Sequence, residues 1–401
     1  MGLSVELKVN NISLMYWKSF FDYKTLGLFF TDDDLVVTEN VKYDEMDPNE
    51  EPHTEYRYST TVQRAIQRLN SIGYTLKNVQ AAFESSCNDC LDYFSLLYDL
   101  GIDIEKYDEI KEERIKKHVA FRKWKNAVIK YAQYEEEHGI LVFFENANIP
   151  ESFKPKTECE RIVFRSKIDY DSESFYGCLY QDFDPINTIR IILESVADDD
   201  ELYVDVTEMV GWTYESIEKM RIGDPTEKTI ILVEGTSNKK ILEFALKHIY
   251  PHLDNLYYFM DFEYVRGKNR PSGIDAISNN TKAFIASRIK TKFIAIFDND
   301  TVGSQAKKRL CYEINPMPEN CRVLTYPDIK LARRYPTIAV NGKTVYDNIN
   351  GRACSIELYL PEFMIKPDEN YLPVEWGNRI QCNVGNEKCI GYQGVISNKM
   401  H

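Results

Sequence analysis

The stretch Thr229-Ile-Ile-Leu-Val233-Glu234-Gly235 and the later stretch Phe293-Ile-Ala-Ile-Phe297-Asp298-Asn299-Asp300 decide the expected fold. Each begins with a continuous run of β-branched and aromatic residues, which is typical of a strand buried on both faces of a parallel sheet. Each run leads directly into acidic residues. Because the carboxyl ends of parallel strands meet at one edge of a sheet, we expect Glu234, Asp298 and Asp300 to share a crevice there.

Three carboxylates in one crevice indicate a site for a hard cation. Mg²⁺ prefers oxygen ligands and usually keeps several waters, and Mn²⁺ is an alternative ion for the same ligands. Unit charges about 4 Å apart repel by roughly 4 kcal/mol at an effective dielectric near 20, so a bound cation would relieve the crowding. An alternative for Asp298 and Asp300 is that they cap a turn or the following helix.

Alternating strand and helix patterns predict the rest of this region, which we expect to begin after Gly223-Asp224-Pro225-Thr226. Helices are expected over Ser237 to Ile249, Ser272 to Arg288 and Ser304 to Ile314. Further strands are expected over Leu256 to Phe262 and Cys321 to Thr325. Such alternation implies right-handed crossovers and an α/β domain with a mostly parallel sheet flanked by helices.

Residues 1–222 predict an α+β, helix-rich domain. Strand-like patterns cover Ser4 to Val9 and Leu202 to Val206. A helical stripe of apolar residues begins near Thr60 and meets a break at Gly73, and a long charged helix, or a bent pair of helices, is expected over residues 106–137.

The order of the motifs carries a resemblance. Leu232-Val-Glu234-Gly235 followed by Ile296-Phe-Asp298-Asn-Asp300 resembles the Toprim domain of topoisomerases, primases and related nucleases. The stretch Asn350 to Leu360, which contains Ser355-Ile-Glu357, is similar to an extra element of the overcoming-lysogenization-defect (OLD) nucleases. Together they resemble the HEPN/Toprim-associated family, which is linked to bacterial antiphage defence.

The resemblance implies a domain plan. Residues 1–222 would form the HEPN/Toprim-associated domain, residues 228–365 the Toprim catalytic domain, and residues 366–401 an extension of it. The chain stops two residues after Lys399, whereas the family pattern continues as a helix, so we expect this extension to be shortened.

The resemblance also implies roles for single residues. Glu234 would be a metal ligand or acid/base group, Asp298 and Asp300 would be metal ligands, and Glu357 would help to hold a second cation. Lys399 would stabilise negative charge on the phosphate. Two ions about 4 Å apart support hydrolysis of phosphodiester bonds. The alternative for Glu357 is an exposed acid without a role.

The HEPN half is expected to be noncatalytic. The active HEPN pattern places four to six residues between an arginine and a histidine, whereas Arg114-Ile-Lys-Lys-His118 has three. A catalytically silent nucleic-acid-binding or scaffold subunit is therefore the alternative to a nuclease for the whole chain. A topoisomerase or primase is disfavoured, because the chain is short for a strand-passage gate or helicase-binding module.

The chain is expected to have no ATP site of its own. Gly342-Lys343-Thr344 mimics the end of a phosphate-binding loop, but Thr337 stands where the leading glycine belongs. Because OLD nucleases commonly work with an ATPase, we expect a regulatory ATPase or another defence protein as partner. Nucleic acid is the expected substrate, and a homo-oligomer remains open.

Composition limits the class of protein. The chain of 401 residues carries a formal net charge of −14, which argues against nonspecific coating of nucleic acid. It contains no apolar run of membrane-span length and no signal-like start, and its nine cysteines fit reduced thiols, so a cytoplasmic protein without membrane contact is expected.

Basic clusters flank the acidic motifs, although a solvated surface explains them nearly as well; they are Arg266 to Arg270, Arg288 to Lys292, Lys307 to Arg309 and Arg333-Arg334. The motifs do not discriminate DNA from RNA.

Overall fold

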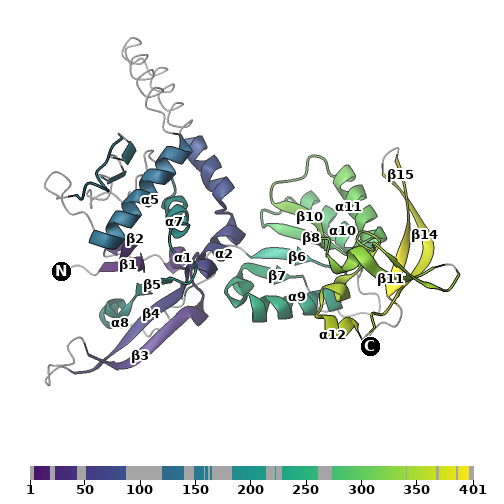
Figure 1. Cartoon of the computed structure of the whole chain (residues 1–401), viewed down its shortest axis with the longest axis horizontal. Helices are drawn as coiled ribbons and strands as arrows, with labels where there is room; N and C mark the ends of the chain where they lie inside the picture. The colour runs from purple at the N-terminus through teal and green to yellow at the C-terminus, as the bar shows by residue number, and fades with distance from the viewer. Residues whose placement is uncertain are drawn as a thin grey trace, which may run out of the picture. The chain divides into compact units, whose positions relative to one another are not determined.

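The computed structural model divides the chain into two compact units, Met1–Thr226 (unit 1) and Glu227–His401 (unit 2) (Figure 1). The structure describes residues 4–18, 23–42, 51–86, 120–139, 149–157, 159–160, 163–164, 183–213, 222, 228–260, 273–339, 341–366, 370–384 and 387–396.

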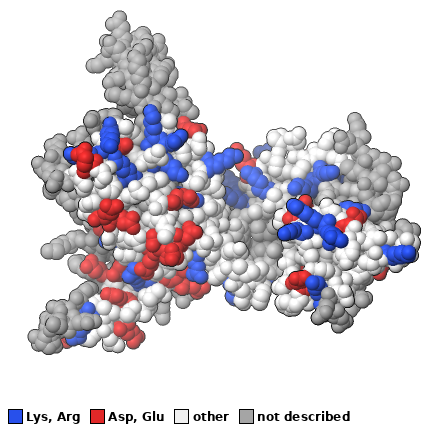
Figure 2. All heavy atoms as spheres, viewed as in Figure 1, with Lys and Arg blue, Asp and Glu red and all other residues white. Residues whose placement is uncertain are grey.

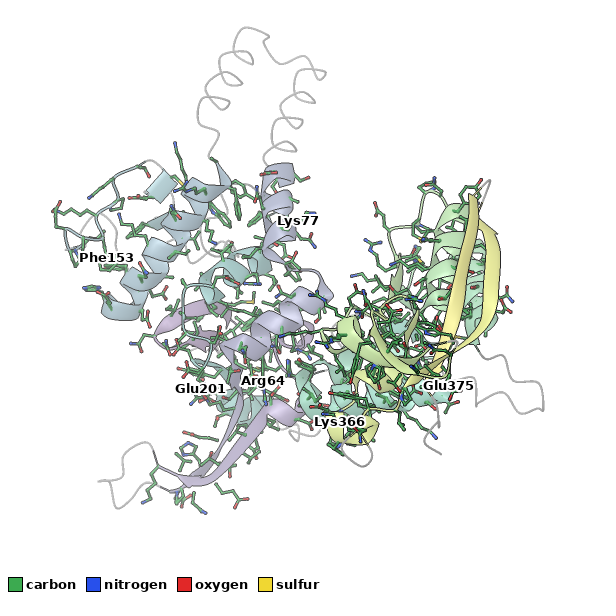
Figure 3. The ribbon with its side chains drawn as sticks, turned by 45° about the vertical axis from the view of Figure 1, so that its right-hand side comes forward. Arg64, Lys77, Phe153, Glu201, Lys366 and Glu375 are labelled. Carbon is green, nitrogen blue, oxygen red and sulfur yellow. The ribbon has the colours of Figure 1, made fainter. Side chains whose placement is uncertain are left out.

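Unit 1 is built on an antiparallel sheet of five strands in the order β2-β1-β5-β4-β3. These strands are β1 (Ser4–Val9), β2 (Ile12–Lys18), β3 (Leu35–Val41), β4 (His53–Thr61) and β5 (Glu201–Asp205). The pairing of β5 with both β1 and β4 joins segments almost 200 residues apart. At the exposed start of β5, Glu201 (Figure 3) accepts hydrogen bonds from Arg57 and Ser59 of β4, each at 2.6 Å.

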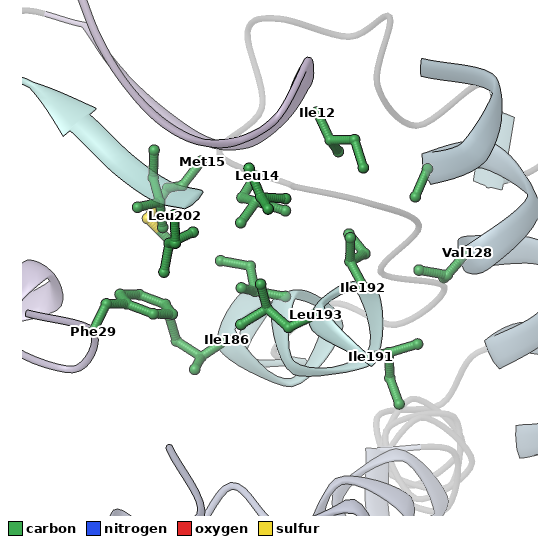
Figure 4. Close-up of a cluster of buried hydrophobic side chains, with 14 of the residues drawn as sticks. Ile12, Leu14, Met15, Phe29, Val128, Ile186, Ile191, Ile192, Leu193 and Leu202 are labelled. Atoms are coloured by element: carbon green, nitrogen blue, oxygen red, sulfur yellow. The ribbon is translucent and has the colours of Figure 1, made fainter. Parts of the chain in front are cut away.

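The described helical elements of unit 1 are α1 (Tyr23–Leu26), η1 (Asp32–Asp34), α2 (Val62–Ile72), α5 (Phe121–His138), α7 (Pro185–Leu193) and α8 (Thr207–Thr213), and residues 76–86 are also helical. Apart from η1, which consists of three aspartates, they bury apolar side chains in one core with the sheet. Helix α7 packs against α2 and α5, and nearly all of its residues are buried. Figure 4 shows Ile186 and Leu193 of α7 near Leu14 of β2 and Leu202 of β5.

The mixed α+β character expected for residues 1–222 is confirmed within the described parts of unit 1. The strand at Ser4–Val9 has its expected bounds, and α2 ends at Gly73, which adopts a left-handed φ of 119°. Of the long charged helix, the described part is α5. Arg114 and His118, on which the noncatalytic interpretation rests, lie outside the described residues.

Unit 2 contains the expected parallel sheet with helices. Its strands β6 (Thr229–Leu232), β7 (Tyr257–Phe259), β8 (Phe293–Phe297) and β10 (Cys321–Thr325) lie in the order β10-β8-β6-β7, all parallel. The connecting helices are α9 (Thr236–Ile249), α10 (Gly273–Ala286) and α11 (Thr301–Glu313). The strand expected over Leu256 to Phe262 begins one residue later, because Leu256 is the last residue of the 3-10 helix η4 (Pro251–Leu256), and it ends at Phe259.

A second sheet in unit 2 has the order β12-β11-β14-β15. The remaining elements of unit 2 are β9 (Asn299–Asp300), η6 (Leu331–Arg334), β11 (Tyr335–Ile338), β12 (Thr344–Asp347), β13 (Ala353–Cys354), η7 (Ile356–Tyr359), α12 (Glu362–Ile365), β14 (Val374–Val384) and β15 (Glu387–Ile396). Within the expected extension 366–401, β14 and β15 form a long antiparallel hairpin. Gly394 lies where an added Cβ would come within 2.4 Å of the Ala353 Cβ, so this glycine lets the hairpin approach β13.

Two hydrophobic clusters hold unit 2 together. One lies between the parallel sheet and helices α10 and α11 and includes Phe293, Phe297 and Leu310. The other lies beneath β11, β13 and β14 and includes Tyr335 and Val374. Among the described helices of the whole chain, none is long and apolar enough to cross a membrane.

Replacement of Leu193 by alanine tests the unit 1 core. Leu193 is fully buried, so Leu193→Ala should lower the free energy of unfolding by about 2–5 kcal/mol. Urea denaturation of the full chain followed by circular dichroism measures the change. Val36→Ala, at a position on β3 that is 49% exposed, serves as the control and should cost under about 0.5 kcal/mol. Equal losses in the two variants would contradict this account of the core.

Candidate metal centre

The carboxyl ends of β6 and β8 form a topological switch point. From β6 the chain passes through α9 to β7 on one side, and it later returns to β8 on the other side. Open parallel sheets bind ligands in the crevice at such a point, because the two connections leave in opposite directions. Glu234 follows β6, Asp298 follows β8, and Tyr326 follows β10 along the same edge.

Glu234 and Asp298 are in direct contact. The backbone N–H of Asp298 donates a hydrogen bond to Oε1 of Glu234 at 2.9 Å. Burial, followed by the charges of Asp298 and Asp300, raises the pKa of Glu234 to about 8, although the bond from the Asp298 N–H acts in the opposite direction. A cation bound beside Glu234 would favour the charged form of this side chain and lower its pKa.

Asp300 has a structural role that sequence reasoning left open as an alternative. It is the N-cap of α11, and its Oδ1 accepts a hydrogen bond from the backbone N–H of Gly303 at 2.7 Å. An added Cβ at Gly303 would stand 2.3 Å from the carbonyl oxygen of Asp298. The glycine thus allows the first turn of α11 to lie directly against the Asp298 loop.

Two asparagines orient carboxylates of the crevice. Asn238, on the first turn of α9 and buried, donates from Nδ2 to Oδ1 of Asp298 at 2.9 Å and to the Tyr326 hydroxyl at 3.4 Å. Asn299 donates from Nδ2 to Oδ1 of Asp328 at 2.9 Å. Neither Asn238 nor Asp328 was a predicted site residue. Asp328 could have been found by the rule that identified Asp298, because it follows the end of the buried strand β10 by three residues.

Glu357 lies in the same electrostatic environment, on η7 and not on a strand. Its charge, with those of Asp298 and Glu234, acts on the Tyr326 hydroxyl, whose pKa is raised chiefly by burial. The segment reaches the crevice because β13 pairs with β9 and the Gly351 N–H donates to the Asn299 carbonyl at 3.0 Å. Glu357 is partly buried, and its metal-binding role stays a prediction.

The donor set fits a hard divalent cation, but it is not a closed cage. Within the described ranges there is no group of three or more His, Cys, Asp and Glu side chains arranged to hold a metal ion. Mg²⁺ needs less than this, since it is usually held by one or two carboxylates with water and phosphate oxygens completing the octahedron. The adjacent Glu234 and Asp298 are the carboxylates best placed for that role.

The structure describes one of two other predicted features. Lys399 lies outside the described residues. Gly342, with a φ of 75°, lies in the turn of the β11–β12 hairpin, closed by a hydrogen bond from the Gly342 N–H to the Ala339 carbonyl at 2.8 Å. The segment that follows Gly342 is a strand, whereas a phosphate-binding loop leads into a helix.

The charge of the chain is divided unequally between its two units. Residues 1–226 contain 44 acidic and 25 basic side chains, whereas residues 227–401 contain 19 acidic and 24 basic ones. Figure 2 shows acidic side chains gathered on the visible face of unit 1 and prominent basic ones on unit 2. The unit with the candidate metal centre is therefore net positive in a strongly acidic protein.

The comparisons with known proteins identify one family. The model described as HEPN/Toprim N-terminal domain 1 matches residues 1–228, which is more than half of the chain. No curated protein and no solved structure matches.

The capping role of Asp300 can be separated from its charge. Asp300→Ala removes the acceptor for the Gly303 N–H, whereas Asp300→Asn keeps an oxygen there. Both remove the same negative charge, so without metal the alanine variant should be about 1 kcal/mol less stable than the asparagine variant. Urea denaturation in EDTA measures the difference. If the two variants unfold at the same urea concentration, the cap does not stabilise α11.

The close approach at Gly303 gives a second test. Gly303→Ala forces a methyl group against the Asp298 carbonyl, so the variant should lose about 1–3 kcal/mol of stability. Ser304→Ala, one residue further along α11, is the matched control and should change stability by under about 0.5 kcal/mol. Thermal unfolding of both variants checks the prediction, and a Gly303→Ala protein as stable as the control would refute it.

Proposed function

Because the chain belongs to the family defined by HEPN/Toprim N-terminal domain 1, we propose that it is a metal-dependent nuclease that hydrolyses phosphodiester bonds of nucleic acid. The observation that carries the proposal is the contact between Glu234 and Asp298 at the switch point of the parallel sheet. Glu234 accepts a hydrogen bond from the Asp298 backbone N–H, and burial, followed by the charges of Asp298 and Asp300, raises its pKa to about 8, so a cation bound there would stabilise its charged form.

Each residue of the candidate metal centre has a proposed role that follows from its position. Glu234 and Asp298 would hold Mg²⁺, or Mn²⁺ in its place, and Asp300 and Glu357 would contribute to a second ion. A bound ion supplies charge stabilisation at phosphoryl oxygens and lowers the pKa of a water. Asn238 keeps the Asp298 carboxylate oriented through its 2.9 Å bond, and Gly303 keeps the α11 turn against the same loop. Lys399 would stabilise charge that develops on the phosphate.

The positive balance of unit 2 supports nucleic acid as the substrate, since phosphate contacts require lysine and arginine. The resemblance to the Toprim domain of OLD nucleases supports a role in antiphage defence in the cytoplasm. A regulatory ATPase or another defence protein would then switch the activity, and self-association of the chain is part of the same proposal.

A catalytically silent nucleic-acid-binding or scaffold subunit is the second candidate. The cap role of Asp300 and the lack of a three-carboxylate cage among the described residues favour it. The two candidates differ in one measurable property, because only the nuclease loses function when the metal is removed.

The decisive assay incubates the purified full chain with plasmid, single-stranded DNA and tRNA in Mg²⁺, Mn²⁺ or EDTA. Cleavage should require the metal, and Glu234→Gln and Asp298→Asn should each reduce it by about a hundredfold or more, since each removes several kcal/mol of charge stabilisation. Glu375→Gln, at an exposed carboxylate on β14 (Figure 3), is the matched control and should cleave like the wild type.

Metal binding is measured separately from catalysis. Mg²⁺ should raise the melting temperature of the wild type and of Glu375→Gln but not of Glu234→Gln or Asp298→Asn. Cleavage that persists in EDTA, or that survives both metal-site substitutions, would eliminate the nuclease. Oligonucleotide binding without any cleavage would select the silent subunit. In the defence assay, cells that produce the wild type should reduce phage plating, and cells that produce Glu234→Gln should not.

A further inference from the structure

A basic and aromatic surface lies beside the candidate metal centre. It comprises η6 and the β11–β12 hairpin, and its exposed members are Lys330, Arg333, Arg334, Lys343 and Tyr346; we call it the η6–β12 surface. Tyr346 is 62% exposed. The Arg334 guanidinium lies over this ring, 5.2 Å from its centroid.

The backbone brings these residues together. In the β11–β12 register, Pro336 lies opposite Tyr346 and Tyr335 lies opposite Asp347. The Ile349 N–H then donates to the Ala332 carbonyl of η6 at 2.9 Å. The basic residues of η6 and the aromatic ring of β12 are therefore parts of one surface.

The positive charge of this surface is not compensated within the described parts of unit 2. None of Lys330, Arg333, Arg334 and Lys343 forms an ion pair there, whereas Arg352 nearby pairs with Asp347 at 2.7 Å. A solvated face accounts for isolated lysines. A guanidinium held over a tyrosine that is 62% exposed places a cation next to an aromatic ring that a ligand can still reach.

Direct contacts connect the surface to the carboxylate crevice. The Asn350 side chain forms two hydrogen bonds with the backbone of Ile329. Its Oδ1 accepts from the Ile329 N–H at 2.9 Å, and its Nδ2 donates to the Ile329 carbonyl at 3.2 Å. The next residue, Gly351, donates its N–H to the Asn299 carbonyl between the two site aspartates. Arg352 pairs with Asp347 at the end of β12, and its backbone forms a bridge to Asp300. A strand bound on the η6–β12 surface would thus be held at a fixed position next to Asp298 and Asp300.

A second basic cluster provides a contrast. Arg288, Lys290 and Lys292 are equally exposed, but they precede β8, whereas Asp298 follows it. A strand of five residues separates the two ends by about 17 Å. This cluster belongs to the opposite edge of the sheet, and it has no partner ring comparable to Tyr346 among the described cation–ring contacts.

We propose that the η6–β12 surface binds single-stranded nucleic acid and presents it to the carboxylate crevice. A base stacks on Tyr346, and the arginines and lysines contact successive phosphates. Single strands are preferred because the bases of a duplex are already stacked and paired, so their faces are not available to the tyrosine. This inference rests on the proposed function, since it names the form of the substrate that the same site would cleave.

The test measures binding by the full chain in EDTA, so that the result does not depend on cleavage. Fluorescence anisotropy with labelled oligothymidylate is titrated over a range of salt concentrations. Arg333→Gln with Arg334→Gln should weaken binding about tenfold or more and reduce the salt slope by about 1.4, which corresponds to two single-strand phosphate contacts. Tyr346→Ala should weaken binding about fivefold or more, but should leave binding of a duplex of equal length unchanged within about twofold.

The matched control removes the same charge from the other edge of the sheet. Lys290→Gln with Lys292→Gln should change the affinity by less than about twofold, since these residues lie about 17 Å from the crevice. Arg333→Lys with Arg334→Lys should keep the salt slope, because lysine retains the phosphate contacts. Circular dichroism and the melting temperature verify that each variant folds, and Tyr346→Phe, which keeps the ring, should bind like the wild type.

Several results would overturn the inference. One is an equal loss of oligonucleotide affinity in the Arg333→Gln, Arg334→Gln variant and the Lys290→Gln, Lys292→Gln variant. The others are an equal effect of Tyr346→Ala on the binding of single strands and of duplex, and the absence of oligonucleotide binding by the wild type. They are independent of the nuclease proposal. A chain that binds single strands through this surface but never cleaves them is the silent subunit, and a chain that cleaves without using the surface is a nuclease with another binding face.

Discussion

The repulsion among carboxylates at the carboxyl ends of β6 and β8 is the constraint on which the rest of unit 2 depends. A protein without a function for Glu234 would gain stability by placing an uncharged side chain there, because burial and the neighbouring aspartates raise the pKa of Glu234 to about 8. The surrounding structure nevertheless keeps the group in place, with an N–H of Asp298 directed at its Oε1. A carboxyl group with a strongly shifted pKa in a crevice is a recurrent property of metal and catalytic sites.

Much of unit 2 can be understood as support for that crevice. Asn238 fixes Asp298 from α9, Asn299 fixes Asp328, and Gly303 permits α11 to begin against the same loop. The short pairing of β9 with β13 attaches the segment of Glu357 to the loop between the parallel sheet and α11. These contacts come from four different parts of the chain and converge on residues 298–300. A site held in this way is rigid, which suits a cation that tolerates little departure from octahedral geometry.

The sequence predicted the elements of unit 2 better than their interactions. Strands β6 and β8 were evident because their apolar runs are continuous, and the acids behind them were found because polar residues after buried strands meet at one edge. Asn238 escaped notice, since its meaning comes from a partner 60 residues away and an asparagine in a first helical turn has many ordinary roles. Glu357 was identified by resemblance alone, and it lies on the 3-10 turn η7.

The net charge of the chain also needs to be interpreted by unit. A value of −14 for the whole protein indicates that it does not coat nucleic acid, and this remains sound for residues 1–226, where acids outnumber bases by 44 to 25. It fails for residues 227–401, where bases are in excess. Because charge interactions between exposed groups are screened within about 10 Å at ordinary salt, the local field around the crevice depends on the charged groups within that distance and not on the net charge of the whole chain. The acidic unit then limits nonspecific association while the basic residues beside the crevice retain their attraction for phosphate, so an acidic protein is compatible with a nucleic-acid substrate.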